Sequence, residues 1–294
     1  MISESGTSAI GYAPGKLILS GEHAVVHGHL CLALAVTLGT TVTLTRREGP
    51  TGIDDAPFSD ARLDDALSAI LPPEGIGVAI ETDLPVGRGM GSSAALAVAL
   101  VRARAVLSGR VADFEECHRE GFAIERVFHG NPSGVDHTVS AMGGGVKYRR
   151  GQPITPLPLP PLTLVVMDTG IAGNTAELVA GVAALPDGTA LLSEIGALTE
   201  AVADALHGPP DALGALLTEN HRLLRGIGVS SPLLDALVGA ALSAGAYGAK
   251  LAGAGGGGVA LALVADPEPV LRAARALGAE AFVARVAPAT GAVG

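Results

Sequence analysis

The stretch 85–95 constrains this chain more than any other part of its sequence. Its glycines alternate at positions 87, 89 and 91, and an apolar run at 94–107 that is typical of a helix follows at once. Glycine lets backbone N–H groups approach a ligand closely, and a helix N-terminus adds partial positive charge and unpaired donors. The alternative is a flexible connector, and no Gly-Lys-Ser/Thr follows that would make this a Walker loop. We predict a phosphate-binding loop formed by Pro85, Gly87, Gly89, Met90, Gly91, Ser92 and Ser93.

Helical and strand patterns are interleaved along the chain, which predicts an α+β fold with mixed sheets. In the first half we expect strands at 9–12, 17–19, 40–46, 77–82 and 142–148, helices at 61–71, 94–107 and 113–128, and a turn at 130–136. In the second half we expect strands at 162–167, 248–251, 259–264 and 281–286, and helices near 175–184, 188–207, 211–225, 232–244 and 270–277. Five prolines at 152–161 exclude a helix and a central strand there. A chain of this length can form one large domain or two, and this proline-rich run is the best candidate for a boundary, which would divide the chain into domains 1–158 and 159–294.

Composition limits the class of protein. The 294 residues are 48% hydrophobic but only 3% aromatic, so the core must be packed from Ala, Val, Leu and Ile. Arg102 and Arg104 interrupt the apolar run that follows the glycine loop, and the N-terminus lacks the pattern of a signal peptide. Cys31 and Cys117 are isolated, which indicates a reducing cytoplasm. The net charge of −10 disfavours nucleic acid. We expect neither a membrane nor a nucleic-acid partner, and a homodimer stays open.

Three further segments have the glycine-rich or polar character of a ligand site. Residues 13–28 read Ala-Pro-Gly-Lys-Leu-Ile-Leu-Ser-Gly-Glu-His-Ala-Val-Val-His-Gly, residues 129–136 read His-Gly-Asn-Pro-Ser-Gly-Val-Asp, and residues 250–258 read Lys-Leu-Ala-Gly-Ala-Gly-Gly-Gly-Gly. With the loop at 85–95 they resemble, in order and over nearly the whole chain, the motifs of the GHMP kinase family. The segments 21–28, 129–136 and 168–175 (Asp-Thr-Gly-Ile-Ala-Gly-Asn-Thr) look most like the mevalonate kinases, in their archaeal and bacterial form.

The resemblance implies a fold. In this family an N-terminal domain like the second domain of ribosomal protein S5 packs against a ferredoxin-like C-terminal domain, with the active site between them. It also implies that ATP is bound by the loop at 85–93 and by Gly255 and Gly256, and that Mg²⁺ is held by Ser93 and Glu125.

The resemblance implies catalytic and substrate-binding residues as well. Asp136 matches the family's proposed base, and Lys16 is expected beside it, where it would stabilise the carboxylate charge and lower the effective pKa of the attacking hydroxyl. Whether Asp136 removes the proton or mainly stabilises charge stays open. The substrate is expected to contact Glu22, His23, Gly134, Asp136, Thr175 and Ala254.

Several of these residues also have a simpler structural interpretation. By itself, Glu125 is typical of a helix-surface carboxylate that pairs with a neighbouring Arg126 or His129. An aspartate such as Asp136 in a turn commonly caps the backbone. The segment 250–258 also fits a tight strand–turn–strand, in which Lys250 stands by chance. A zinc site is a further alternative, but the spacing of the histidines that would form it, His23, His27 and His29, fits no standard pattern.

The expected activity is transfer of the ATP γ-phosphate to the 5-hydroxyl of mevalonate, in isoprenoid precursor biosynthesis. One alternative is another GHMP kinase, acting on phosphomevalonate, a sugar or homoserine; the other is a non-catalytic ligand sensor of the same fold. Phosphomevalonate should require extra cations around the substrate, whereas a sensor should lack the reactive residues. His137 and Gly173 depart from the animal pattern, which leaves eukaryote-like feedback control without support.

Overall fold

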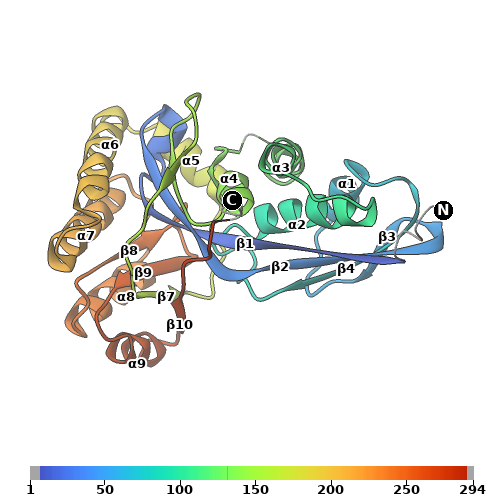
Figure 1. The fold of residues 1–294 in the computed structure, drawn as a ribbon. Helices are drawn as coiled ribbons and strands as arrows, with labels where there is room; N and C mark the ends of the chain where they lie inside the picture. Colours follow the sequence, from blue (N-terminus) through green and yellow to red (C-terminus); the bar gives the residue numbers. More distant parts are fainter. Residues whose placement is uncertain (1–6, 131, 290–294) are drawn as a thin grey trace.

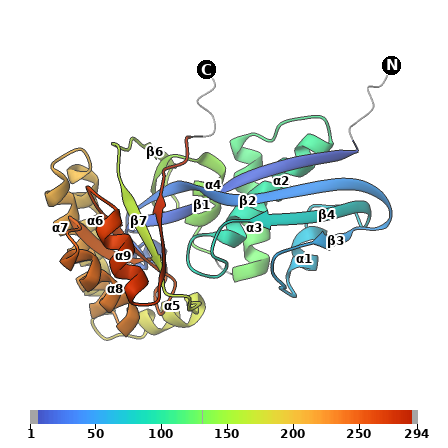
Figure 2. The ribbon, with the colours of Figure 1, turned by 90° about the horizontal axis from the view of Figure 1, so that it is seen from below.

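The computed structural model describes residues 7–130 and 132–289, which form two β-sheets with helices packed against each (Figure 1). The helices α1 to α4 cover one face of the first sheet, and α5 to α9 gather around the second. The long strands β1 and β2 run from the first sheet toward the second, and the view from below shows the same arrangement (Figure 2). The predicted α+β character is therefore confirmed.

The first sheet is built around β2 (Cys31–Pro50). On one side β2 pairs with β1 (Ser8–Ser20), and on the other with β4 (Glu74–Thr82) and β5 (Gly145–Tyr148). The short strands β3 (Gly52–Asp55) and β6 (Thr155–Leu157) are at the edges. The strands expected at 9–12 and 17–19 are one strand, because Pro14 and Gly15 occupy an irregularity in the β1–β2 register instead of ending it.

Four helices pack on this sheet: α1 (Leu63–Ser68), α2 (Ser92–Leu107), α3 (Phe114–His129) and α4 (Val135–Met142). Most residues of α2 are buried, and its alanines, valines and leucines pack with those of the sheet, as the composition predicts. The Asp113 carboxylate caps α3 by accepting a hydrogen bond from the Glu116 N–H at 2.8 Å. The packing of α2 with the sheet holds in place the helix that begins at the glycine loop.

The helix α4 is absent from the prediction, which was wrong in placing a strand from residue 142. The chain leaves the turn at Gly134, forms two helical turns, and β5 begins only at Gly145. Val135, Thr138 and Val139 have low helix propensity, so the local sequence hides the helix. All three are buried, and this burial stabilises the helix.

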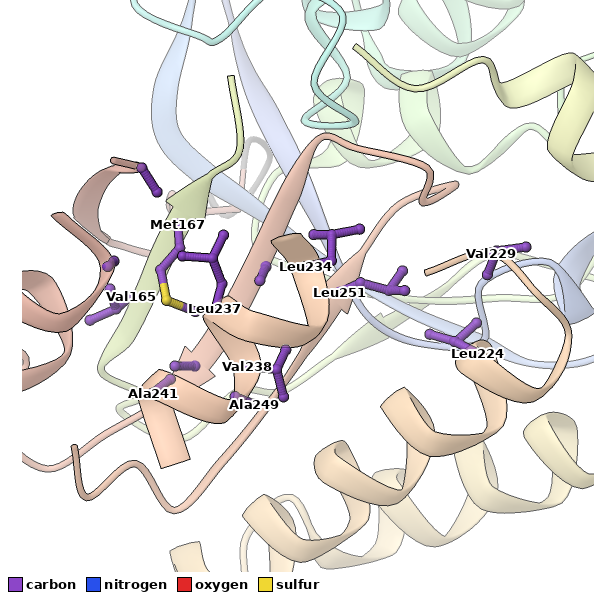
Figure 3. Packing of buried hydrophobic residues seen from close by; sticks show 14 of the residues in the cluster. Val165, Met167, Leu224, Val229, Leu234, Leu237, Val238, Ala241, Ala249 and Leu251 are labelled. Atoms are coloured by element: carbon purple, nitrogen blue, oxygen red, sulfur yellow. The ribbon is translucent and has the colours of Figure 1, made fainter. Parts of the chain in front are cut away.

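The second sheet is antiparallel, in the order β10 (Glu280–Ala284), β7 (Leu164–Asp168), β9 (Val259–Leu263) and β8 (Gly248–Ala252). One face packs against α8 (Pro232–Ser243) and α9 (Glu268–Ala276); Figure 3 shows Leu237 and Val238 of α8 against Val165, Met167 and Ala249. The remaining helices are α5 (Thr175–Ala183), α6 (Gly188–Ala205) and α7 (Pro210–Gly226). The predicted elements of this half are confirmed, with ends shifted by a few residues.

The other face of the second sheet meets the ends of β1 and β2. Leu164 and Leu261 share a core with Leu17 and Leu32, because alternate strand residues point to opposite faces. The chain crosses between the sheets after Leu157, and residues near 286–289 return to pair with Val36 and Gly143. The proline-rich segment contributes only the edge strand β6, and the domain boundary at 158/159 stays a prediction.

Among the described residues, no single helix is long and apolar enough to cross a membrane. Two helical segments, Glu177–Ala183 and Gly188–Ala205, are bent by 108° relative to each other. Taken together, this pair is long and apolar enough by length and composition alone.

Candidate active site

The glycine loop leads from β4 into α2, as the sequence predicts for a phosphate cradle. Gly91 is the N-cap of α2 with φ of 73°, a left-handed conformation that favours glycine. The first intrahelical bond joins the Ala95 N–H to the Gly91 carbonyl at 2.9 Å, which leaves the N–H groups of Ser92, Ser93 and Ala94 without an acceptor inside the helix. The loop therefore presents unpaired donors at the positive end of a buried helix.

An ion pair lies directly beside this helix start. The Lys16 Nζ is 3.2 Å from Asp136 Oδ1; the lysine side chain is 4% exposed and the aspartate side chain 30% exposed. The Lys16 N–H also donates to the Met90 carbonyl at 2.9 Å, and a Cβ on Gly91 would lie 2.9 Å from Lys16 Cγ. Asp136 is in the first turn of α4, where the helix dipole stabilises a negative charge. The predicted catalytic residues are thus brought together at the glycine loop.

Glu22 is buried against a partner from the far end of the sequence. Its carboxylate forms an ion pair with Lys250, and both side chains are at most 1% exposed. Burial raises the pKa of Glu22, and Lys250 opposes that shift. The second oxygen, Oε2, is buried and has no hydrogen-bond partner in the described part of the chain. Glu22 therefore offers a buried acceptor that is still free.

His23 offers a second acceptor of the same kind. Its Nε2 lies 2.8 Å from the Ala254 carbonyl, so this nitrogen carries the proton and donates. Burial lowers the pKa of His23, which keeps the ring neutral. Its Nδ1 is then an acceptor, and it is buried without a partner among the residues described. His23 also has φ of 60°, which a non-glycine residue adopts only under local strain.

Ser93 and Glu125 lie together near Asp136. Burial and the nearby Asp136 charge raise the pKa of Glu125 to about 8, although a hydrogen bond from Ser93 opposes this shift. Glu125 is 1% exposed, and its Oε1 has no partner within the described residues. Ser93 Oγ also lies 3.0 Å from His129 Nε2. A buried, unsatisfied carboxylate oxygen beside a hydroxyl is a donor set that Mg²⁺ prefers, so these residues fit the ion.

The glycine segment 253–258 lies against the glycine loop at 85–93. A Cβ on Gly253 would lie 3.3 Å from the Gly89 Cα, so both positions need glycine for the two loops to touch. Thr175, predicted to contact substrate, begins α5 at the rim of the cavity between these loops. This cavity is lined by Gly87, Arg88, Gly89, Gly173, Thr175, Ala252, Ala254, Gly255, Gly257 and Gly258.

Two residues at this site were not assigned a role from sequence. Lys250 had no assigned partner, because nothing local indicates that it faces Glu22 across 228 positions. Arg88, which stands between Gly87 and Gly89, was not assigned a role either, yet it lines the cavity and faces Asp168. The roles of the remaining predicted residues, Pro85, Gly134 and Gly256 included, stay predictions.

The zinc alternative has no support within residues 7–130 and 132–289. No group of three or more His, Cys, Asp or Glu side chains in that part of the chain is placed to hold a metal ion. His23 instead bonds Ala254, and His29 packs against Gly196 of α6.

Known proteins share this fold and sequence over most of the chain. Residues 61–144 match the GHMP kinases N terminal domain, and residues 201–284 match the GHMP kinases C terminal family. The mevalonate kinase of Thermococcus gammatolerans is 36% identical over 87% of this chain and 89% of its own. That of Pyrococcus horikoshii is 36% identical over 85% and 87%. The crystal structure of L. major mevalonate kinase in complex with R-mevalonate aligns with a TM-score of 0.82 and 29% identity, covering 96% of both chains.

These matches confirm the predicted two-domain GHMP kinase fold of mixed α and β content. They span both sheets and include the glycine loop, Glu125 and Asp136 in the N-terminal match and Lys250 in the C-terminal one. The chain belongs to the GHMP kinase family.

Proposed function

We propose that this protein is a mevalonate kinase, which transfers the γ-phosphoryl group of ATP to the 5-hydroxyl of mevalonate. The observation that carries the proposal is the Lys16–Asp136 ion pair, held at 3.2 Å against the N-terminus of α2. Phosphoryl transfer depends mainly on positioning and charge stabilisation, and this pair would supply both next to a phosphate cradle. The relatives named above carry the same activity in their names.

In this proposal the nucleotide phosphates bind at the N–H groups that open α2 and at the glycines of 253–258. Ser93 and Glu125 are the residues that would hold Mg²⁺, since Glu125 Oε1 is buried without a partner among the described residues. The ion, when bound, would neutralise part of the phosphate charge.

The chain's own residues carry the chemical step. The 5-hydroxyl oxygen forms a bond to the γ-phosphorus while the bond from that phosphorus to the bridging oxygen breaks, which releases ADP. Asp136 receives the hydroxyl proton, and Lys16 stabilises the negative charge that develops on the attacking oxygen. Lys16 keeps its position because its backbone N–H is bonded to Met90 of the loop itself.

Two observations favour an acceptor without a phosphate group over a phosphorylated substrate. Lys16 and Lys250 are each already paired with a carboxylate, so neither is a free cation for a second phosphate group. The buried acceptors Glu22 Oε2 and His23 Nδ1 are instead suited to receive hydrogen bonds from hydroxyl groups. Mevalonate provides hydroxyls and carries only its carboxylate charge, whereas phosphomevalonate adds a phosphate group, whose further negative charge these acceptors would repel.

An ADP-release assay with mevalonate, phosphomevalonate, galactose and homoserine tests the proposal. We expect turnover with mevalonate and little with the other three. Preferred turnover of another acceptor would assign the chain to a different GHMP kinase, and no turnover with ATP bound would favour a sensor.

The setting of the enzyme belongs to the same proposal. Cys31 and Cys117 are both buried and unpaired, which accords with a reducing compartment, and we place the protein in the cytoplasm. Light scattering on the purified chain distinguishes a monomer from a homodimer.

A further inference from the structure

Arg88 is a cation inside the glycine loop to which the proposed mechanism gives no task. It stands between Gly87 and Gly89 and lines the cavity between the two glycine segments. Its side chain is 23% exposed, but Nη1 is completely buried and has no hydrogen-bond partner in the described part of the chain. A buried guanidinium donor without an acceptor costs free energy of folding. A bound ligand that supplies an acceptor would remove this cost.

The only carboxylate that forms an ion pair with Arg88, among the described residues, holds it loosely. Arg88 Nε lies 4.0 Å from Asp168 Oδ1, which is beyond hydrogen-bonding distance. Asp168 ends β7 in the second sheet, and the same oxygen accepts a hydrogen bond from the Gly170 N–H at 2.9 Å. By comparison, Lys16 is held at 3.2 Å by Asp136, and Lys250 is fully buried against Glu22. Arg88 is therefore the least neutralised of these three cations, and it lines the cavity.

We propose that Arg88 is a phosphate-binding residue, whose guanidinium leaves Asp168 and binds oxygens of the ATP phosphate chain. The planar, five-donor guanidinium matches phosphate geometry, and charge-assisted bonds of this kind are strong. Asp168 belongs to the second sheet, whereas Arg88 belongs to the glycine loop beside the first. Exchange of the Asp168 carboxylate for phosphate at Arg88 would therefore link nucleotide binding to the junction of the two sheets. The inference rests on the proposed function insofar as the loop binds ATP.

A structural role makes a different prediction from a phosphate-binding one. If the Arg88–Asp168 pair only holds the two sheets together, removing either side chain should weaken ATP binding in the same direction. If Asp168 competes with phosphate for the guanidinium, removing the arginine should weaken binding, while neutralising the aspartate should leave it unchanged or strengthen it. Asp168→Asn is suited to this comparison because the amide oxygen can still accept from Gly170.

The experiment is calorimetric titration of ATP into the wild type and the variants Arg88→Met, Arg88→Lys and Asp168→Asn. Arg119→Met is the control, since that arginine is 70% exposed on α3. We expect the ATP dissociation constant to rise about ten- to hundredfold for Arg88→Met, which corresponds to one charged hydrogen bond. Arg88→Lys should recover part of the loss, Asp168→Asn should bind at least as tightly as the wild type, and Arg119→Met should not change.

An ATP affinity of Arg88→Met within twofold of the wild type would overturn the inference, as would equal losses in Arg88→Met and Asp168→Asn. The substrate panel separates this failure from that of the proposed function. A wild type that turns over mevalonate while Arg88→Met binds ATP normally overturns the role of Arg88 alone. If Arg88→Met loses ATP affinity but the wild type does not turn over mevalonate, only the proposed substrate is overturned.

Discussion

Lys250 and Glu22 form an ion pair that is almost completely shielded from solvent, although 228 positions separate them in the sequence. Lys250 comes from β8 of the second sheet, and Glu22 follows β1 of the first. Strand alternation turns Lys250 toward the junction while Ala249 and Leu251 face the opposite core. The pair thus fixes the substrate-side carboxylate and joins the two sheets at the same point.

Lys250→Met should destabilise the fold and disturb the site. Removing one partner of a buried pair leaves an uncompensated charge, which costs about 3–5 kcal/mol. Urea unfolding measures this loss, and Lys147→Met serves as the matched lysine control because Lys147 is only partly buried. The double variant Glu22→Gln with Lys250→Met should recover part of the stability. A Lys250→Met protein as stable as the wild type would show that the pair is dispensable.

Gly89→Val should impair ATP binding more than it impairs folding. Gly89 has φ of 81°, and a Cβ there would lie 3.4 Å from the Ala252 carbonyl, so a branched side chain both strains the backbone and separates the two glycine segments. Gly278→Val is the control: its φ of 79° gives the same strain, but its surroundings are open. We expect similar losses of stability by circular dichroism and a loss of ATP affinity, of about tenfold or more, in Gly89→Val alone. Equal ATP affinities would place the phosphate site elsewhere.

Glu125→Gln should raise the Mg²⁺ concentration needed for half-maximal activity, because a neutral amide is a poorer ligand for this ion than a carboxylate. Loss of a group that only orients a metal ligand typically weakens metal binding by about tenfold or more. Loss of a direct ligand such as Glu125 should therefore raise the required Mg²⁺ concentration by more than about tenfold. Rate against Mg²⁺ at fixed ATP measures it. Glu115→Gln, at an exposed position of the same helix, should leave the curve in place. An unchanged curve in Glu125→Gln would restrict that residue to a structural role.

His137 should make the fold sensitive to acid. Burial holds its pKa at about 4, and rings of His118 and Phe122 pack around it. The ordinary value is about 6.5, so between these pH values the unfolded chain binds a proton that the folded chain does not. The free energy of unfolding therefore falls as the pH falls below about 6.5, and at pH 5 it is about 2 kcal/mol lower than it would be without this proton.

Urea unfolding between pH 7 and pH 5 checks this dependence. His137→Phe should lose about 2 kcal/mol less than the wild type over that interval. His207→Phe, at an exposed position, should behave as the wild type does. Identical pH dependence in His137→Phe and the wild type would mean that His137 is not buried as a neutral ring.

Local patterns in the sequence were sufficient to predict most of the elements. The glycines at 87, 89 and 91 predict a loop at the start of a helix, and the structure has that loop ending at Gly91. The helix α4 could not be predicted in this way, because Val135 and Val139 favour strands and only their burial stabilises the helix. Tertiary contact decided the outcome there.

The site was predictable only as far as its motifs reach. Lys16 and Asp136 were expected to be neighbours because the family resemblance implies it, and they are. The pairing of Lys250 with Glu22 and of Arg88 with Asp168 depends on how the two sheets meet, which no local pattern of residues encodes.

The most direct test of the account is the turnover of Asp136→Asn, measured together with its affinity for ATP. The substitution removes a charge at the reacting hydroxyl and leaves the N–H groups at the start of α2 in place. We predict that kcat falls by about 10²–10⁴ while the ATP dissociation constant stays near that of the wild type. A variant that retains nearly full kcat with mevalonate would contradict the assignment of Asp136, and with it the proposed mechanism.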